Sequence, residues 1–266
     1  VVRDFEDESI PHIEGSVDPE RDIGIMNLEL AFSDLTIIER RLDRLEASLK
    51  GAKHQEREVA VREQALLSRI KSGLEEDIPI REQNLPEQEV KEIENFQFLT
   101  AKPLLLLLNI GEGQLSEASS LETQWSSRYR RPCLEVAVLC GQLEMELAQL
   151  SDHEAHEFRA SMGLGESGLD RMIRISYGVL GLISFFTVVS DEARAWTIRR
   201  NATVQKAAGK VHSDMERGFI RAEVISCDDL LACGSIAEAR KRGLLRLEGK
   251  NYVVKDGDLV TVLFNV

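Results

Sequence analysis

Apolar residues in the first third of the chain recur with helical spacing. Residues 25–74 contain no proline, and apolar side chains return in alternating steps of three and four. This seam comprises Leu28, Ala31, Leu35, Ile38, Leu42, Leu45 and Leu49, and a weaker stripe resumes at Val59, Leu66, Ile70 and Leu74. A glycine-containing break at residues 50–54 separates the two stripes. The pattern predicts an antiparallel coiled-coil hairpin that ends before Ile78 and Pro79.

Two short apolar runs have the pattern of parallel strands that are buried on both faces. Residues 104–108 are five leucines, opened by Pro103 and closed by Asn109 and Gly111, and residues 134–139 form the second run. Residues 1–5 look like the end of a further strand. Ligands of open α/β sheets bind beyond the carboxyl ends of such strands, so we expect a site there.

The residues after the leucine run carry the candidate chemistry. An amide at Asn109 and a carboxylate at Glu112 can both hydrogen-bond to a purine edge. Asn-x-x-Glu resembles the base-reading motif Asn-Lys-x-Asp of P-loop GTPases, with Ile110 in place of Lys and Glu112 in place of Asp. The alternative is a turn, because Asn commonly follows a strand for that reason alone.

Other segments read as helices and loops. An acidic loop is expected up to Asp22, a helix from Pro86, a loop over residues 111–120, and helical patterns up to about Ala160. From Ser184 the chain has no proline and becomes rich in β-branched residues. Strands are predicted at 195–198, 220–225 and 259–265, with a helix at 203–211 and a turn at 256–258. This is a mixed domain of β-grasp size.

Two further motifs have competing interpretations. Residues 163–168 match G-x-G-x-x-G, but a dinucleotide fingerprint follows a strand, whereas this one follows a helical pattern. We interpret it as a cap and loop before a helix at 169–180. His153 and His156 are three apart and so able to share a metal, but their acidic neighbours favour a solvated helix face. No metal site is therefore predicted.

Charge is unevenly distributed along the 266 residues, whose formal net charge is −13. Residues 184–266 hold 13 basic and 11 acidic residues, whereas residues 1–183 hold 20 and 35. The acidic residues 1–183 argue against nonspecific nucleic-acid binding by the whole chain, but a local basic surface can still bind nucleic acid.

The four cysteines show no C-x-x-C spacing, there is no signal peptide, and the apolar run at 178–189 is too short to span a bilayer. We expect a cytoplasmic protein with reduced thiols and no membrane contact.

Several stretches, taken together, resemble the Obg-like ATPases of the YchF subfamily over essentially the whole chain. The most specific is residues 216–225, Glu-Arg-Gly-Phe-Ile-Arg-Ala-Glu-Val-Ile. Others are Arg-Asp-Phe-Glu-Asp at 3–7, Leu-Thr-Ala-Lys-Pro at 99–103, Asn-Ile-Gly-Glu at 109–112, Glu-Ala-Arg-Ala-Trp-Thr at 192–197 and Ala-Ala-Gly-Lys-Val-His at 207–212.

The resemblance implies an α/β G-domain remnant, formed by residues 1–22 and 96–183. A coiled-coil hairpin is inserted at 23–95, and a TGS domain of β-grasp fold follows at 184–266. The parent protein is then a P-loop NTPase that binds ATP or GTP with Mg²⁺, ATP being preferred. The family's P-loop, switch regions and Asp-x-x-Gly motif are expected before Val1. No catalytic residue is therefore assigned here, and this chain alone is expected to be inactive.

The same resemblance implies a base-binding site. Asn109, Ile110 and Glu112 would read the base, Phe5 and Ile110 would sandwich its ring, and the backbone at Cys140 and Gly141 would close the pocket. Cys140-Gly141-Gln142 departs from the family's Ser-Ala-Lys form at this point. Side-chain contacts from this loop are therefore not assigned.

The expected partner is the ribosome or another translation component. RNA contact through the TGS domain would use Arg199, Arg200, Lys206 and Lys210, beside Arg194, Arg217 and Arg221, and the hairpin tip would add Lys50, Lys53 and His54. Alternatively, these charges solvate the domain and pair with Asp214 and Glu216.

A non-enzymatic adaptor that binds RNA or protein without turning over nucleotide is a second interpretation of the whole chain. A TGS module of a tRNA synthetase or stringent-response enzyme is disfavoured, because residues before 184 carry neither class's motifs.

Overall fold

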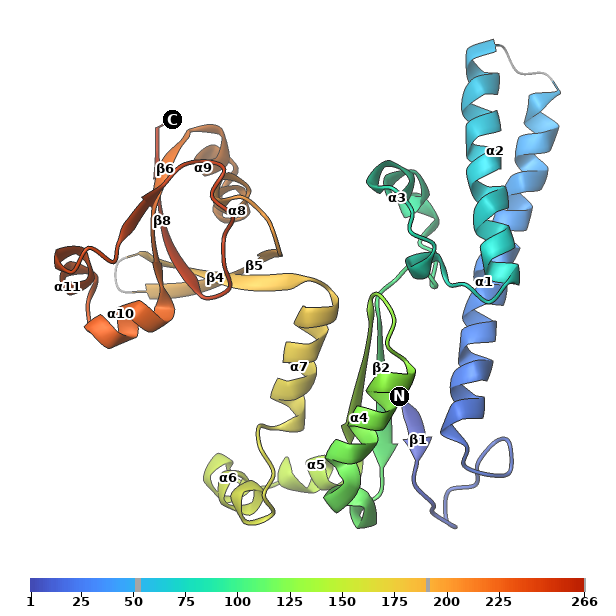
Figure 1. Ribbon diagram of the computed structural model, residues 1–266, viewed down its shortest axis with the longest axis horizontal. Helices are drawn as coiled ribbons and strands as arrows, with labels where there is room; N and C mark the ends of the chain where they lie inside the picture. Colours follow the sequence, from blue (N-terminus) through green and yellow to red (C-terminus); the bar gives the residue numbers. More distant parts are fainter. Residues whose placement is uncertain (51–53, 190–191, 266) are drawn as a thin grey trace. The chain divides into compact units, whose positions relative to one another are not determined.

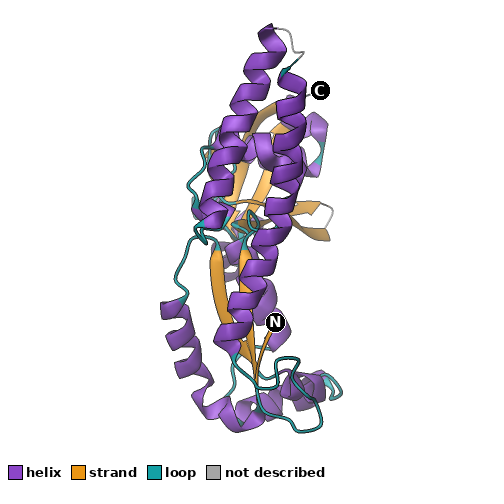
Figure 2. Ribbon diagram, turned by 90° about the vertical axis from the view of Figure 1, so that its right-hand side faces the viewer, coloured by secondary structure: helices purple, strands orange, loops and turns teal. Residues whose placement is uncertain are grey.

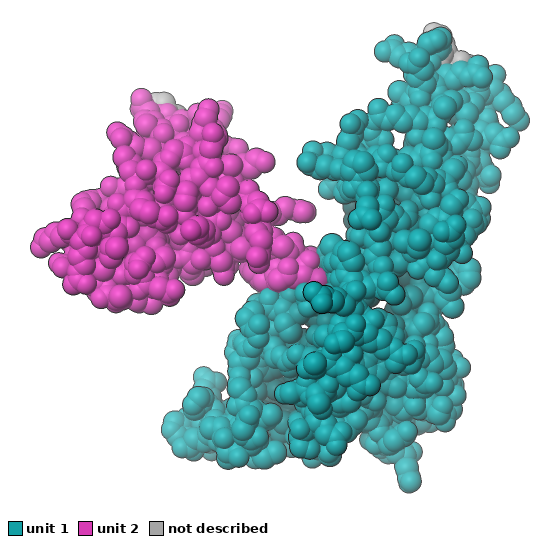
Figure 3. Space-filling view, viewed as in Figure 1, with its two compact units in different colours: residues 1–175 teal, residues 176–266 magenta. Residues whose placement is uncertain are grey.

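The computed structural model describes residues 1–50, 54–189 and 192–265. The chain divides into two compact units, Val1–Ile175 and Ser176–Val266, which Figure 3 distinguishes by colour. Each unit has its own hydrophobic core and is described by itself.

The first unit contains a parallel sheet of three strands in the order β1-β2-β3 (Figure 1). The strands are β1 (Val2–Asp4), β2 (Leu104–Ile110) and β3 (Leu134–Leu139). On the central strand β2, Leu106, Leu108 and Ile110 are buried, whereas Leu104, Leu105, Leu107 and Asn109 are only half-buried. The predicted burial on both faces is thus wrong for β2, which buries one face fully and the other in part.

Helices α1 (Pro19–Leu49) and α2 (His54–Glu75) run antiparallel, side by side (Figures 1 and 2). Their shared core contains Ile38, Leu45, Leu66, Leu67, Ile70 and Leu74. Leu28 is 47% exposed, so the seam begins later than predicted. The reason is length: α2 has 22 residues against 31 in α1, so the first turns of α1 extend beyond the paired region.

Helix α1 also begins earlier than predicted. The Asp18 carboxylate accepts a hydrogen bond from the Arg21 N–H at 3.1 Å, and Pro19 follows as the first helical residue. Both are standard helix-start features. The acidic loop that was expected to reach Asp22 therefore ends at Asp18.

A short connecting region joins the helix pair to strand β2. It comprises the 3₁₀ turn η1 (Ile80–Glu82), α3 (Glu87–Ile93) and the 3₁₀ turn η2 (Glu94–Phe96). The fully buried Asp34 of α1 accepts the N–H groups of Leu99 and Thr100, each at 2.8 Å. The Thr100 carbonyl in turn accepts the N–H of Arg81 at 3.1 Å. These bonds join α1, η1 and the segment before β2.

Helices follow strands β2 and β3. The 3₁₀ helix η3 (Glu112–Glu117) and α4 (Ala118–Arg128) occupy the segment predicted as a loop over 111–120, so that prediction is wrong. After β3 come α5 (Gly141–Leu147), α6 (Asp152–Ser161) and α7 (Gly168–Val179). Gly163, with φ of +66°, lies in the turn after α6, and Gly168 begins α7. The glycine motif therefore links two helices, as predicted.

The second unit is built on a five-stranded mixed sheet in the order β5-β4-β8-β6-β7. The strands are β4 (Leu182–Val189), β5 (Glu192–Arg199), β6 (Phe219–Ser226), β7 (Arg246–Glu248) and β8 (Asp258–Phe264). Strands β4 and β8 are parallel at its centre. The predicted strands and the helix at 203–211, observed as α8 (Val204–Val211), are confirmed. Short helices α9 (Ser213–Arg217), α10 (Cys227–Cys233) and α11 (Ile236–Lys241) were not predicted.

Candidate functional site

The three parallel strands of the first unit bring the predicted base-binding residues to one edge. Asp4 of β1 pairs with Ile110 of β2, and Asn109 pairs with Leu139 of β3. The residues that follow each strand therefore lie next to one another at the carboxyl edge, where α/β sheets bind ligands.

Asn109 connects the ends of β2 and β3. Its side-chain Oδ1 accepts the N–H of Gly141, the first residue of α5, at 2.8 Å. A Cβ at position 141 would lie 3.0 Å from that oxygen, so the close approach requires glycine or a shift of the amide. Within the described residues, no hydrogen bond uses the Asn109 Nδ2 group. The amide is therefore held in place by its oxygen, while its two N–H donors are unused within the described residues.

Gln114 organises the next turn of chain. Its Oε1 accepts the N–H of Gly111 at 2.9 Å, and a Cβ at Gly111 would lie 3.3 Å from the Cβ of Phe5. The turn after β2 is thereby held against the end of β1. Sequence reasoning missed Gln114, although a Gln three residues after a potential N-cap is a capping-box signal.

Arg3 fixes the loop after β1. Its Nε donates to the Phe5 carbonyl at 2.9 Å and its Nη1 donates to the Ile10 carbonyl at 2.7 Å, while the guanidinium lies 4.7 Å from the Phe5 ring centroid. The Ser9 hydroxyl and N–H both donate to Asp7 and hold the pKa of that carboxyl below its ordinary value. The loop is thus ordered by its own polar groups.

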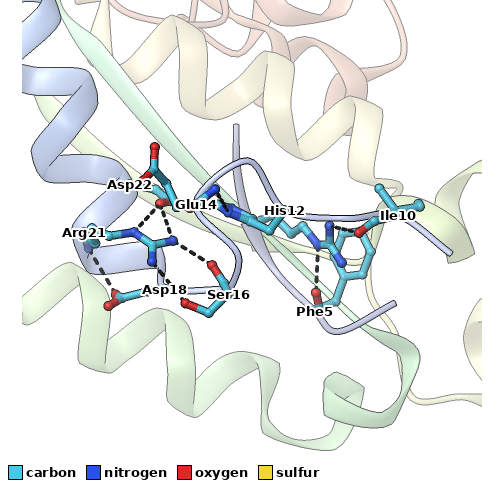
Figure 4. A network of polar contacts seen from close by, with 9 residues as sticks. Phe5, Ile10, His12, Glu14, Ser16, Asp18, Arg21 and Asp22 are labelled. Carbon is cyan, nitrogen blue, oxygen red and sulfur yellow. Dashed lines mark hydrogen bonds and ion pairs between the residues drawn. The ribbon is translucent and has the colours of Figure 1, made fainter. Parts of the chain in front are cut away.

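The same loop is attached to the first turn of α1 (Figure 4). The His12 Nε2 lies 2.9 Å from the Asp22 carboxylate, and Arg21 donates to both Ser16 and Asp22. The position of Phe5 is therefore coupled to the start of the long helix.

Two of the predicted base contacts are buried in the core. Ile110 is 2% exposed and Cys140 is 4% exposed. The pleat places Ile110 on the same face as Leu106 and Leu108, so its side chain packs into the core beside them. The predicted sandwich of a base ring between Phe5 and Ile110 stays a prediction. Phe5 remains half-buried beside Gly111, and Glu112 is exposed at the start of η3.

Four cations predicted to contact RNA are exposed in the second unit. They are Arg199, Arg200, Lys206 and Lys210, and none makes an ion pair with any residue of the described ranges. Lys206 and Lys210 lie one turn apart on α8. By contrast, Arg194 pairs with Glu192 at 3.1 Å, and Arg217 pairs with Asp214. Pairing with acidic neighbours thus accounts for only part of the basic set.

The predicted tip contacts are only partly described. Lys50 is exposed just after α1, and His54 is exposed at the start of α2, 3.6 Å from Glu58. Lys53 lies outside the described residues.

Over residues 1–50, 54–189 and 192–265, no three His, Cys, Asp or Glu side chains are grouped as a metal site would require. His153 instead lies 3.7 Å from Glu157. No helix within these ranges has the length and apolarity that a membrane crossing needs. All four cysteines are free.

Comparison with known proteins gives relatives over the whole chain. The ribosome-binding ATPase YchF of Bacillus subtilis is 41% identical over 268 residues, covering 100% of this chain and 72% of the relative. Obg-like ATPase 1 of Caenorhabditis elegans is 34% identical over 271 residues, covering 100% of this chain and 67% of the relative. The YchF-GTPase_C family model, described as "Protein of unknown function (DUF933)", matches residues 182–265.

A solved structure agrees with these matches. The structure of the Schizosaccharomyces pombe YchF GTPase superposes with a TM-score of 0.83 at 31% sequence identity. The match covers 98% of this chain and 70% of the solved one.

Proposed function

Because the chain belongs to the family of the ribosome-binding ATPase YchF and the Obg-like ATPases, we propose that it carries the base-binding part of a P-loop NTPase that acts in translation. One observation carries this proposal: Asn109 is oriented by Gly141 so that its Nδ2 is left as a donor at the carboxyl edge of the sheet. The N7 atom of a purine is an acceptor that this donor suits.

The sheet order of each unit and the helix pair support an assignment of residue ranges to the domains of the family. In this proposal the three-stranded parallel sheet is the carboxyl half of a G domain, and residues 23–95 are its coiled-coil insertion. The second unit is a TGS domain, because the order β5-β4-β8-β6-β7 with a central parallel pair is that of a β-grasp fold.

The base site favours ATP, with GTP tolerated. Adenine and guanine both offer N7 to Asn109, so this contact does not discriminate between them. The usual guanine-reading pair is replaced by Ile110 and Glu112, and Ile110 is buried in the core. In calorimetry on a protein that joins this chain to the P-loop segment of a YchF relative, ATP·Mg²⁺ should bind at least as tightly as GTP·Mg²⁺. Much tighter GTP binding would contradict the proposed preference.

We predict that the 266-residue chain by itself hydrolyses neither ATP nor GTP. No G-x-x-x-x-G-K-[ST] pattern occurs in it, and that loop cradles the phosphates in P-loop enzymes. Phosphate release should equal the buffer blank after purification to a single species. Release that persists and co-purifies with the chain would refute the prediction.

Ribosome binding is the second part of the proposal, and the unpaired cations of the second unit support it. Arg199→Glu/Arg200→Glu should lower the fraction that co-sediments with ribosomes at low salt and flatten its salt dependence, because phosphate contacts release counterions. Replacement of residues 50–54 by a Gly-Ser turn should also lower the fraction that co-sediments with ribosomes. A cytoplasmic location follows from this role.

The matched control also replaces two arginines by glutamates, but these arginines are already in ion pairs with acidic residues. Arg240 pairs with Glu223 and Arg242 pairs with Glu238 in the same unit, so Arg240→Glu/Arg242→Glu should bind as the wild type does. Equal losses for both double variants would indicate a general charge effect and remove the assignment. Ribosome binding combined with no purine binding by the P-loop-containing protein would favour the adaptor alternative.

A further inference from the structure

A pocket lies where the helix pair meets the sheet of the first unit. It has a volume of about 580 Å³, within the range of small-molecule sites. Its walls come from α1, the turn between α2 and η1, the end of α4 and the start of β3. Leu28, Leu74, Ile78 and Leu134 make part of the wall apolar.

Arg81 is the distinctive group of this pocket. Its side chain is 4% exposed, and its Nη1 donates to the Thr100 carbonyl at 3.3 Å. Its Nε is the one buried side-chain nitrogen or oxygen without a hydrogen-bond partner in residues 1–50, 54–189 and 192–265. The nearest carboxylate oxygen, on Glu82, is 4.0 Å away, which is too far for a hydrogen bond. A buried unpaired donor is unusual, and it belongs to a guanidinium that lines the pocket.

The remaining polar wall carries both signs of charge. Arg131 lies 3.7 Å from Glu82, and the acidic residues Glu76 and Asp77 line the same pocket. The side-chain amide of Asn27 also lines the pocket and has no hydrogen bond to any described residue. A simple anion would meet three carboxylates here, and a simple cation would meet two guanidinium groups.

We propose that this pocket binds a small zwitterion with an apolar side chain, of the α-amino-acid class. Its carboxylate would accept from the Arg81 guanidinium, its ammonium would face the carboxylates of Glu76 and Asp77, and its side chain would contact the apolar part of the wall. Such a ligand matches both signs of charge and the apolar surface. The inference does not depend on nucleotide binding, because no residue of this pocket belongs to the edge that carries Asn109.

The test is calorimetric titration of the 266-residue chain with L-leucine, L-methionine and L-phenylalanine. At least one should give saturable binding with one site per chain. Three analogues of the amino acid that binds serve as controls: its amide lacks the carboxylate, its N-acetyl derivative lacks the ammonium, and glycine lacks the side chain. Each should bind about tenfold more weakly or worse than the amino acid itself. Absence of saturable binding for all three amino acids at millimolar concentration would overturn the proposal.

Two variants locate the site. Arg81→Lys keeps the positive charge but removes the Nε donor, and Leu28→Glu places a carboxylate at a lining position that is 47% exposed. Each should weaken binding about tenfold or more. Phe32→Glu is the matched control, because Phe32 is 59% exposed on the same helix and does not line the pocket.

Thermal unfolding separates loss of binding from loss of fold. Leu28 is on the surface, so Leu28→Glu should unfold at the same temperature as Phe32→Glu, and it decides the question if Arg81→Lys is unstable. Unchanged amino-acid binding in Leu28→Glu, or equal losses in Leu28→Glu and Phe32→Glu, would show that the ligand binds elsewhere.

Discussion

Replacement of Asp34 by Ala is expected to lower the free energy of unfolding of the first unit by about 2–4 kcal/mol. Asp34 is fully buried on α1, and its two carboxylate oxygens accept the N–H groups of Leu99 and Thr100 at 2.8 Å each. Alanine would leave both backbone donors without their acceptor, and the Thr100 N–H lies in the buried interior, where no water replaces it. Asp34→Asn keeps one acceptor oxygen, so it should cause an intermediate loss.

The measurement must report on one unit at a time. Trp125 lies in the first unit and Trp196 in the second, so urea unfolding followed by Trp125 fluorescence in a Trp196→Phe background isolates the first. Asp43→Ala is the matched control, because Asp43 is exposed on the same helix and has no ion pair within the described residues. Equal unfolding midpoints for Asp34→Ala and Asp43→Ala would mean that the two hydrogen bonds do not hold the helix pair to the chain before β2.

Asp34 also shows what the sequence could not supply. It stands between Ser33 and Leu35 in a helical pattern, where a charged residue normally faces water. Its partners are 65 and 66 residues further along the chain. The same holds for Arg81, whose Nη1 donates to the carbonyl of Thr100, 19 residues further along the chain. Such contacts depend on tertiary packing, which no local pattern encodes.

The elements themselves were more accessible to sequence reasoning. Strand β3 was predicted over its observed bounds, because a run of apolar residues bounded by Pro132 and Gly141 leaves few alternatives. The early start of α1 was readable from Asp18 and Pro19, but acidic residues on both sides made the segment look like a loop. The direction of the Ile110 side chain follows from the pleat of β2, and the motif alone did not carry that information.

The candidate base site could be predicted from the sequence only in part, unlike strand β3, whose bounds were predicted, and unlike the long-range contacts of Asp34 and Arg81, which were not predicted. Asn109 was predicted at a strand end, and parallel pairing of β2 with β3 requires it to approach Gly141. The hydrogen bond itself joins residues 32 apart, and it specifies which atom of the amide is occupied. Only with that contact known can the structural role of Asn109 be separated from its role toward a ligand.

In a protein that joins this chain to the P-loop segment of a YchF relative, Asn109→Ala is expected to weaken ATP binding by about 1–3 kcal/mol, or roughly 5- to 150-fold. The change removes the donor proposed for purine N7. It also leaves the Gly141 N–H without its acceptor, so the unfolding temperature should fall as well. Calorimetric titration with ATP·Mg²⁺ and thermal unfolding measure the two effects separately.

Asn109→Asp separates the two roles. A carboxylate keeps an oxygen for the Gly141 N–H at the 2.8 Å position but has no N–H to offer, and its charge faces the purine acceptor. This variant should therefore retain more of the wild-type unfolding temperature than Asn109→Ala and yet lose at least as much affinity for ATP. If Asn109→Asp bound ATP as the wild type does, the amide would be a connector between β2 and α5 alone. The base would then be read elsewhere on the sheet edge.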